Sequence, residues 1–72
     1  MPSKKLGEIL RELREARGLT QAQLAERAQI ALSYVTVIEA GHGQQTPPSR
    51  QILDRLARAL GVPAKRLGES EQ

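Results

Sequence analysis

Hydrophobic and polar positions follow helical spacing from the beginning of the chain. The first apolar set occupies one helix face, at positions i, i+3, i+4 and i+7: Leu6, Ile9, Leu10 and Leu13. Ser3 can cap the start of this helix, and Gly18 followed by Leu19 is typical of a left-handed helix stop. The pattern predicts a first helix over about residues 4–17.

The next two predicted helices are joined by a short turn. Thr20 and Gln23 have the spacing of a capping box, in which each side chain bonds the other residue's free backbone N–H, and they predict a helix over about 21–28. A further helix is predicted over about 32–40, ending before Gly41. The connection of about three residues is too short for full antiparallel stacking, so it favours a helix-turn-helix.

The remainder of the chain predicts a loop and two more helices. Residues 42–48 are rich in Gly, Gln and Pro, as loops are. Ser49 predicts the start of a helix over about 50–60, and a last short helix is predicted over about 63–67. The inward-facing residues of these later segments are Leu24, Ala25, Ala28, Ile30, Val35, Ile38, Ile52, Leu53, Leu56, Ala57, Leu60 and Leu67. Residues 1–72 are therefore predicted to form one all-α domain of five helices.

Composition narrows the chemistry that this domain can carry. There is no cysteine, so disulfides and thiolate metal sites are excluded, and the single histidine, His42, reads as a solvated loop residue. The acids Glu8, Glu12 and Glu15 share a helix face with basic neighbours and read as a solvated surface. No nucleophile stands beside a plausible base, and no apolar run approaches the roughly 20 residues of a membrane span. We expect a cytoplasmic protein that is not an enzyme and that has no cofactor or small-molecule site.

Several blocks of the chain resemble the Xre, or lambda-repressor/Cro-like, helix-turn-helix domains. The matching blocks, in order, are GLTQAQLAERA (18–28), Ile30, SYVT (33–36), IEAG (38–41), PS (48–49) and LARALGV (56–62). They extend over residues from about 6 to 67. The resemblance implies the five-helix lambda-repressor-like fold and a DNA-binding function.

The resemblance also implies roles for individual residues. In that family the third helix enters the major groove, and the second helix points its N-terminus at a phosphate. Gln21 would bond that phosphate, and Arg14 and Glu39 would form a structural ion pair. Base-reading positions would be Leu32, Ser33, Thr36 and Val37, preceded by Ala31, with Tyr34 flanking the groove and its hydroxyl near the DNA backbone. Arg50 would lie at the edge of the contact, and His42, Gln44, Gln45 and Thr46 either reach the DNA or form a flexible surface loop.

The chain departs from the family pattern at its turn and at its third helix. Gln29 stands where the family usually has glycine, and Ala31 replaces the usual Ser or Thr cap. Arg, Lys, Asn and Gln, which make bidentate bonds to base edges, are missing from the exposed positions of the third helix. Although the whole chain carries a net charge of +3, two acids and one base leave the stretch from 18 to 49 at −1.

Three interpretations of the function follow. The first is a sequence-specific regulator that binds operator DNA as a homodimer, with two third helices about 34 Å apart and the fourth and fifth helices in contact. Val62 and Leu67 are the apolar candidates for that contact, unless they complete the core. The second is an antitoxin-like or adaptor module that binds a protein through the apolar strip of Ala31, Leu32, Val37 and Ala40. The third is a domain with no partner of its own.

Overall fold

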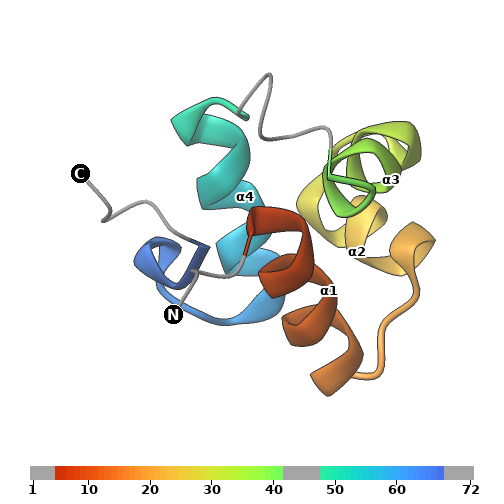
Figure 1. Ribbon diagram of the computed structural model, residues 1–72, viewed down its shortest axis with the longest axis horizontal. Coiled ribbons are helices and arrows are strands. Elements are labelled where there is room, and N and C mark those ends of the chain that lie inside the picture. Colours follow the sequence, from red (N-terminus) through yellow and green to blue (C-terminus); the bar gives the residue numbers. More distant parts are fainter. Residues whose placement is uncertain (1–4, 42–47, 68–72) are drawn as a thin grey trace.

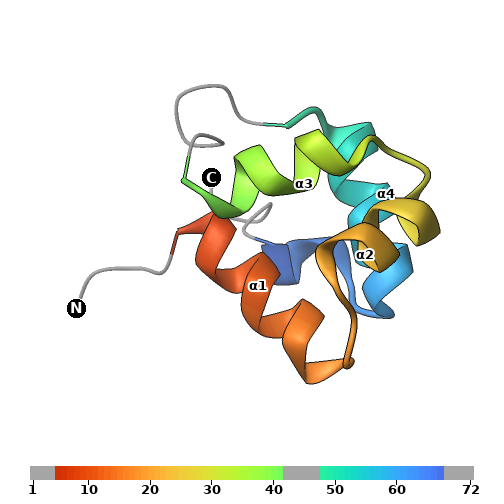
Figure 2. The ribbon, with the colours of Figure 1, turned by 90° about the vertical axis from the view of Figure 1, so that its right-hand side faces the viewer.

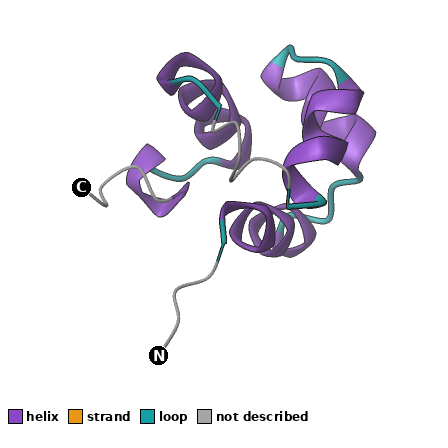
Figure 3. Cartoon of the chain, turned by 45° about the horizontal axis from the view of Figure 1, so that its top comes forward, coloured by secondary structure: helices purple, strands orange, loops and turns teal. Residues whose placement is uncertain are grey.

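Four α-helices and one 3-10 turn account for the regular structure in the part of the chain described by the computed structural model, residues 5–41 and 48–67. The elements, in order, are α1 (Leu6–Ala16), α2 (Gln21–Ala28), α3 (Leu32–Glu39), α4 (Arg50–Leu60) and the 3-10 turn η2 (Ala64–Leu67). Within those ranges the ribbon consists of helices and loops only (Figure 3). The fold is all-helical, as the periodicity predicts.

The prediction of five α-helices is wrong at the C-terminal end. The last element is one 3-10 turn, in which Arg66 donates its backbone N–H to the carbonyl oxygen of Pro63 at 2.9 Å. A segment of four residues cannot build the i to i+4 ladder of an α-helix, whereas the tighter i to i+3 bond suits such short pieces.

The first helix begins later than predicted. Its N-cap is Lys5, whose backbone N–H donates to the Glu8 carboxylate at 3.3 Å, so the prediction that Ser3 caps this helix is wrong. Ser3 itself lies outside the described residues. The acidic side chain in the first turn supplies an acceptor for a free N–H group and a favourable charge at the positive end of the helix dipole.

Left-handed residues end the helices as the sequence predicts, including at the position where glycine is replaced. Gly18 has φ 71°, and the next residue, Leu19, is buried and donates its N–H to the carbonyl of Arg14 at 3.1 Å. Gln29 has φ 60° and ends α2 in the same way, with Ile30 donating to Ala25 at 3.0 Å. Among the described residues, Gln29 is the one non-glycine with positive φ.

The core lies where the helices meet, and each element contributes to it. The fully buried side chains are Leu10, Leu24, Val35, Ile38, Leu56 and Leu60. The other predicted core residues are either buried with them or packed against them. Helix α2 packs on both α3 and α4, while η2 packs on α4 and α1, so α4 and η2 lie to one side of the α2–α3 pair (Figure 1).

A glycine inside α1 sets the distance between α1 and α3. A Cβ atom at Gly7 would meet the carbonyl oxygen of Ile38 closer than real Cβ contacts allow, and it would lie 3.1 Å from the Cα of Glu39, which is tighter than most such contacts. The start of α1 therefore lies directly against the C-terminal end of α3 (Figure 2). This close approach brings the side chains of α1 within reach of Glu39.

Candidate nucleic-acid interface

Helices α2 and α3 pack on one another and form a helix-turn-helix unit. The capping box at its start is formed, with Gln23 N–H donating to Thr20 Oγ1 at 3.0 Å and Thr20 N–H to Gln23 Oε1 at 2.9 Å. Between the helices, the carbonyl of Gln29 accepts a hydrogen bond of 3.2 Å from Arg55 Nη1 of α4. The beginning of α2 and the turn after it are thus both fixed by side-chain hydrogen bonds.

An ion pair between Arg14 and Glu39 joins α1 to the end of α3. Nε of Arg14 donates to Oε2 of Glu39 at 2.7 Å, and Nη2 donates to Oε1 at 3.0 Å, which is the two-pronged geometry of the strongest Arg–carboxylate pairs. The two side chains are 11% and 4% exposed. The hydrogen bond to Glu39 raises the pKa of the Arg14 guanidinium above its ordinary value, against the opposing effect of burial.

Gln21 belongs to the same network. Its Nε2 donates to Oε1 of Glu39 at 2.9 Å, so the carboxylate that holds Arg14 also orients the first residue of α2. Arg14 in turn donates through Nη1 to the carbonyl of Leu19 at 2.8 Å, in the segment that leads into α2. Glu39 therefore links the predicted phosphate-binding residue to the end of the predicted recognition helix.

The outward side of α3 carries the predicted base-reading residues together. We define the outer α3 face as Leu32, Ser33, Thr36 and Val37 of α3 together with Ala40, the C-cap residue directly after it, all of which are exposed. Leu32 and Val37 are 47% and 45% exposed and are the large exposed hydrophobics of the described residues. Val35 and Ile38 point into the core on the opposite side, so α3 is apolar on both sides.

The other predicted site residues differ in their exposure and position. Ala31 is exposed and has the extended backbone of an N-cap, but it offers no side-chain cap to α3. Tyr34 is half-buried and packs against the core, and Arg50 is exposed at the first residue of α4. His42, Gln44, Gln45 and Thr46 lie outside the described residues. Leu67 is 3% exposed and completes the core, so its alternative assignment to a dimer contact is wrong.

Two residues support this unit through contacts that the sequence does not predict. Gly7 interrupts a helical pattern, which is a signal of close packing, but its partner on α3 is not visible in the sequence. Arg55 reads as an ordinary exposed residue of an amphipathic helix, and no local pattern points to its bond with the turn. Both residues act through contacts with segments more than 20 positions away.

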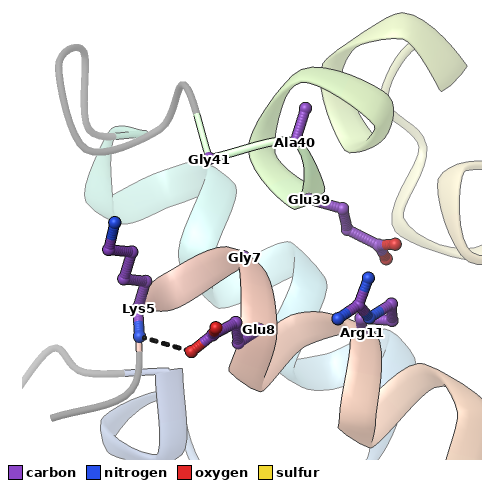
Figure 4. A pocket seen from close by; sticks show the side chains of 7 residues that line it. All are labelled: Lys5, Gly7, Glu8, Arg11, Glu39, Ala40 and Gly41. Atoms are coloured by element: carbon purple, nitrogen blue, oxygen red, sulfur yellow. Dashed lines mark hydrogen bonds between the residues drawn. The ribbon is translucent and has the colours of Figure 1, made fainter.

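Shallow clefts between described residues border the unit. One, of about 250 Å³, lies between the start of α1 and the end of α3, where the side chains of Arg11 and Glu39 point toward one another (Figure 4). Another, of about 370 Å³, is lined by Arg27, Arg55 and Arg58 beside the turn. No three potential metal ligands gather anywhere in the described segments. Of the helices described, none has the length and apolar character needed to cross a bilayer.

The chain is similar in sequence to known helix-turn-helix regulators. The HTH-type transcriptional regulator DdrOP3 of Deinococcus deserti is 43% identical over 58 residues, which cover 81% of this chain and 43% of that regulator. The chain thus spans less than half the length of this curated relative.

Two solved structures are similar along most of their length. The restriction-modification controller protein C.AhdI from Aeromonas hydrophila has a TM-score of 0.78 at 39% identity, covering 86% of this chain and 89% of that chain. The N-terminal DNA-binding domain of SinR from Bacillus subtilis has a TM-score of 0.78 at 31% identity, covering 93% of this chain and 94% of that chain. The family model described as a helix-turn-helix domain matches residues 5–69. The chain belongs to the helix-turn-helix domain family, and within it to the Xre type.

Proposed function

We propose that this chain binds operator DNA in a sequence-specific manner and regulates transcription in the cytoplasm, without catalysis. The observation that carries the proposal is the α2–α3 unit, whose α3 face is exposed while its opposite side is locked into the core. The relatives named as a transcriptional regulator, a controller protein and a DNA-binding domain support it. Their names give no support to the alternative of a protein-interaction module.

In the proposed complex, α3 lies in the major groove and the beginning of α2 meets the DNA backbone. The free N–H groups and the positive dipole end of α2 favour a phosphate there, beside Gln21. Glu39 orients Gln21 through the bond to its Nε2, so the phosphate contact and the base contacts keep a fixed relative position. Arg50, at the start of α4, adds a cation at the edge of the groove.

We further propose that the domain acts as a homodimer. A single eight-residue recognition helix reads only a few base pairs, and two copies bound about one DNA turn apart, about 34 Å, double the site. The dimer contact is assigned to η2 and to the part of α4 that does not pack on α2 (Figure 1). Half-buried Val62 remains an apolar candidate for it, whereas buried Leu67 does not.

Titration of the purified chain against duplex DNA tests this function. A random-sequence duplex and a duplex taken from upstream of its own gene are compared at about 50 mM and about 200 mM salt. We expect the chain to bind the upstream duplex more tightly and to bind both duplexes more weakly at the higher salt concentration. Absence of binding to either duplex at the lower salt concentration would refute a DNA-binding function.

Matched charge variants locate the contact. Ser33→Glu or Thr36→Glu adds a negative charge to the outer α3 face, and we expect each to abolish binding by repulsion from the phosphates. Ala16→Glu adds the same charge at the exposed end of α1, which lies across the molecule from α3 (Figures 1 and 2), and should leave the affinity unchanged. Equal losses from all three variants would mean that α3 is not the contact surface.

A further inference from the structure

The outer α3 face lacks the groups with which proteins usually identify bases. Bidentate recognition needs Arg or Lys for guanine, Asn or Gln for adenine, or a carboxylate for cytosine. None of these side chains occurs among the five residues of this face. Discrimination among base pairs must therefore come from hydroxyl groups or from apolar contact.

The hydroxyl groups of this face can donate few hydrogen bonds to DNA bases. Thr36 Oγ1 donates to the carbonyl oxygen of Leu32 at 3.0 Å, which commits its only proton within the helix. Its oxygen can still accept, and its methyl group remains part of the face. Ser33 is then the one side-chain donor of the face that is not committed within the described structure.

Apolar groups dominate what remains. Leu32 and Val37 each expose almost half of their surface, at the first turn of α3 and five residues later. Two half-exposed side chains among Ser, Thr and Ala do not supply the ~800 Å² per partner that a stable protein interface buries. The face is also uncharged, so it does not repel DNA. In the major groove, the apolar group within reach of side chains is the C5 methyl of thymine.

On the basis of the proposed DNA-binding function, we propose that this domain reads operator DNA chiefly through C5 methyl groups in the major groove, with Leu32 and Val37 as the specificity-determining residues. The methyl group, and not the hydrogen-bonding edge of the base, is what the two side chains contact. 5-Methylcytosine carries the same methyl group at the same ring position. It therefore replaces thymine at the contacted positions, whereas uracil and unmodified cytosine do not.

Deoxyuridine substitution tests this inference, because it removes the methyl group of thymine and keeps its base pairing. A binding duplex is first selected from a random-sequence pool, and each of its thymines is then replaced by deoxyuridine in turn. We expect a loss of affinity of about fourfold for each contacted methyl group, which corresponds to one buried methyl. Placing 5-methylcytosine paired with guanine at the same position should restore part of the affinity that unmodified cytosine loses.

Protein variants assign each methyl group to a side chain. In Leu32→Ala and Val37→Ala, the preference for thymine over deoxyuridine should disappear at one position of each half-site and remain at the others. Both side chains are exposed, so the variants should keep the helical content and melting temperature of the parent chain, measured by circular dichroism. Arg11→Ala, at an exposed position of α1 outside the outer α3 face, is the control and should leave the thymine preference unchanged.

The outcomes separate this inference from the proposed function. If the pool yields no enriched duplex, the DNA-binding function itself fails. If a duplex is enriched but deoxyuridine changes its affinity by less than twofold at every position, the chain binds DNA and methyl-group reading is wrong. The same conclusion follows if Leu32→Ala and Val37→Ala both retain the full preference for thymine.

Discussion

Glu39 holds Arg14 through two hydrogen bonds, of 2.7 Å and 3.0 Å, across 25 positions of sequence. The pair joins the last turn of α1 to the end of α3, and the same carboxylate accepts a third hydrogen bond from Gln21. An almost fully buried carboxylate thus finds three donors from two elements. The arrangement makes α1 a brace for the helix-turn-helix unit.

Breaking this pair on one side should destabilise the domain strongly. We expect Glu39→Ala to lower the free energy of unfolding by roughly 3 kcal/mol, because it leaves the guanidinium of Arg14 poorly solvated and without its partner. The double variant Arg14→Leu/Glu39→Leu removes both charges and should recover at least half of that loss. Urea unfolding measures both changes.

As a control, Glu26→Ala, at an exposed position of α2, should change the stability by less than about 0.5 kcal/mol. A loss below about 1 kcal/mol for Glu39→Ala would show that the pair does not brace the fold.

Gly7→Ala should destabilise the domain although alanine is the better helix former. In an open helix this change gains about 1 kcal/mol, but here the new Cβ meets the carbonyl oxygen of Ile38 closer than real Cβ contacts allow. The atoms that the new Cβ would meet belong to the backbone of α3 and not to a flexible side chain, so α1 and α3 must move apart. We expect the free energy of unfolding to fall by about 2 kcal/mol. Thermal unfolding should show a melting temperature lower by roughly 8–16 °C. Arg11→Ala, at an exposed position of the same helix, is the control; a gain in stability for Gly7→Ala would mean that the two helices are not in close contact.

Gln29→Gly should stabilise the domain. Gln29 has φ 60°, a backbone conformation that destabilises a residue with a Cβ atom by about 1 kcal/mol. Glycine adopts this conformation without that penalty. The hydrogen bond from Arg55 is to the backbone carbonyl, so glycine retains it. The same exchange at Gln51, an exposed helical position of α4, should lose about 1 kcal/mol. Opposite shifts of melting temperature for the two variants are expected, and a fall for both would contradict a strained turn.

The salt dependence of DNA binding should be shallow for a helix-turn-helix protein. The segment from 18 to 49 has a net charge of −1, so few cations of the contact surface displace counterions. With at most about four phosphates neutralised by each domain, log K should fall against log salt with a slope no steeper than about −4. Titrations at four salt concentrations measure the slope. A value near −8 per domain would mean that cations outside this segment carry the binding.

The sequence by itself determined the helices and their inward faces. Apolar residues at helical spacing specify which side of each segment is buried, and local capping groups such as Thr20, Gly18 and Gly61 specify where helices begin and end, because these interactions span only a few residues. The prediction of a last α-helix is wrong because the apolar pattern of a four-residue segment does not distinguish a 3-10 turn from an α-helix.

The tertiary structure alone decided how the site is held together. The approach of Gly7 to Ile38, the bond of Arg55 to the turn and the sharing of Glu39 by Arg14 and Gln21 all join segments that are distant along the chain. Such contacts depend on the distance and the angle between packed helices, and local sequence patterns specify neither of these quantities. The sequence predicts that Val35 and Ile38 face inward, and they fill the core as predicted. Packing decides how much apolar surface stays open on the other side of α3: Leu32 and Val37 are 47% and 45% exposed, because the described elements that pack on α3 leave that side uncovered.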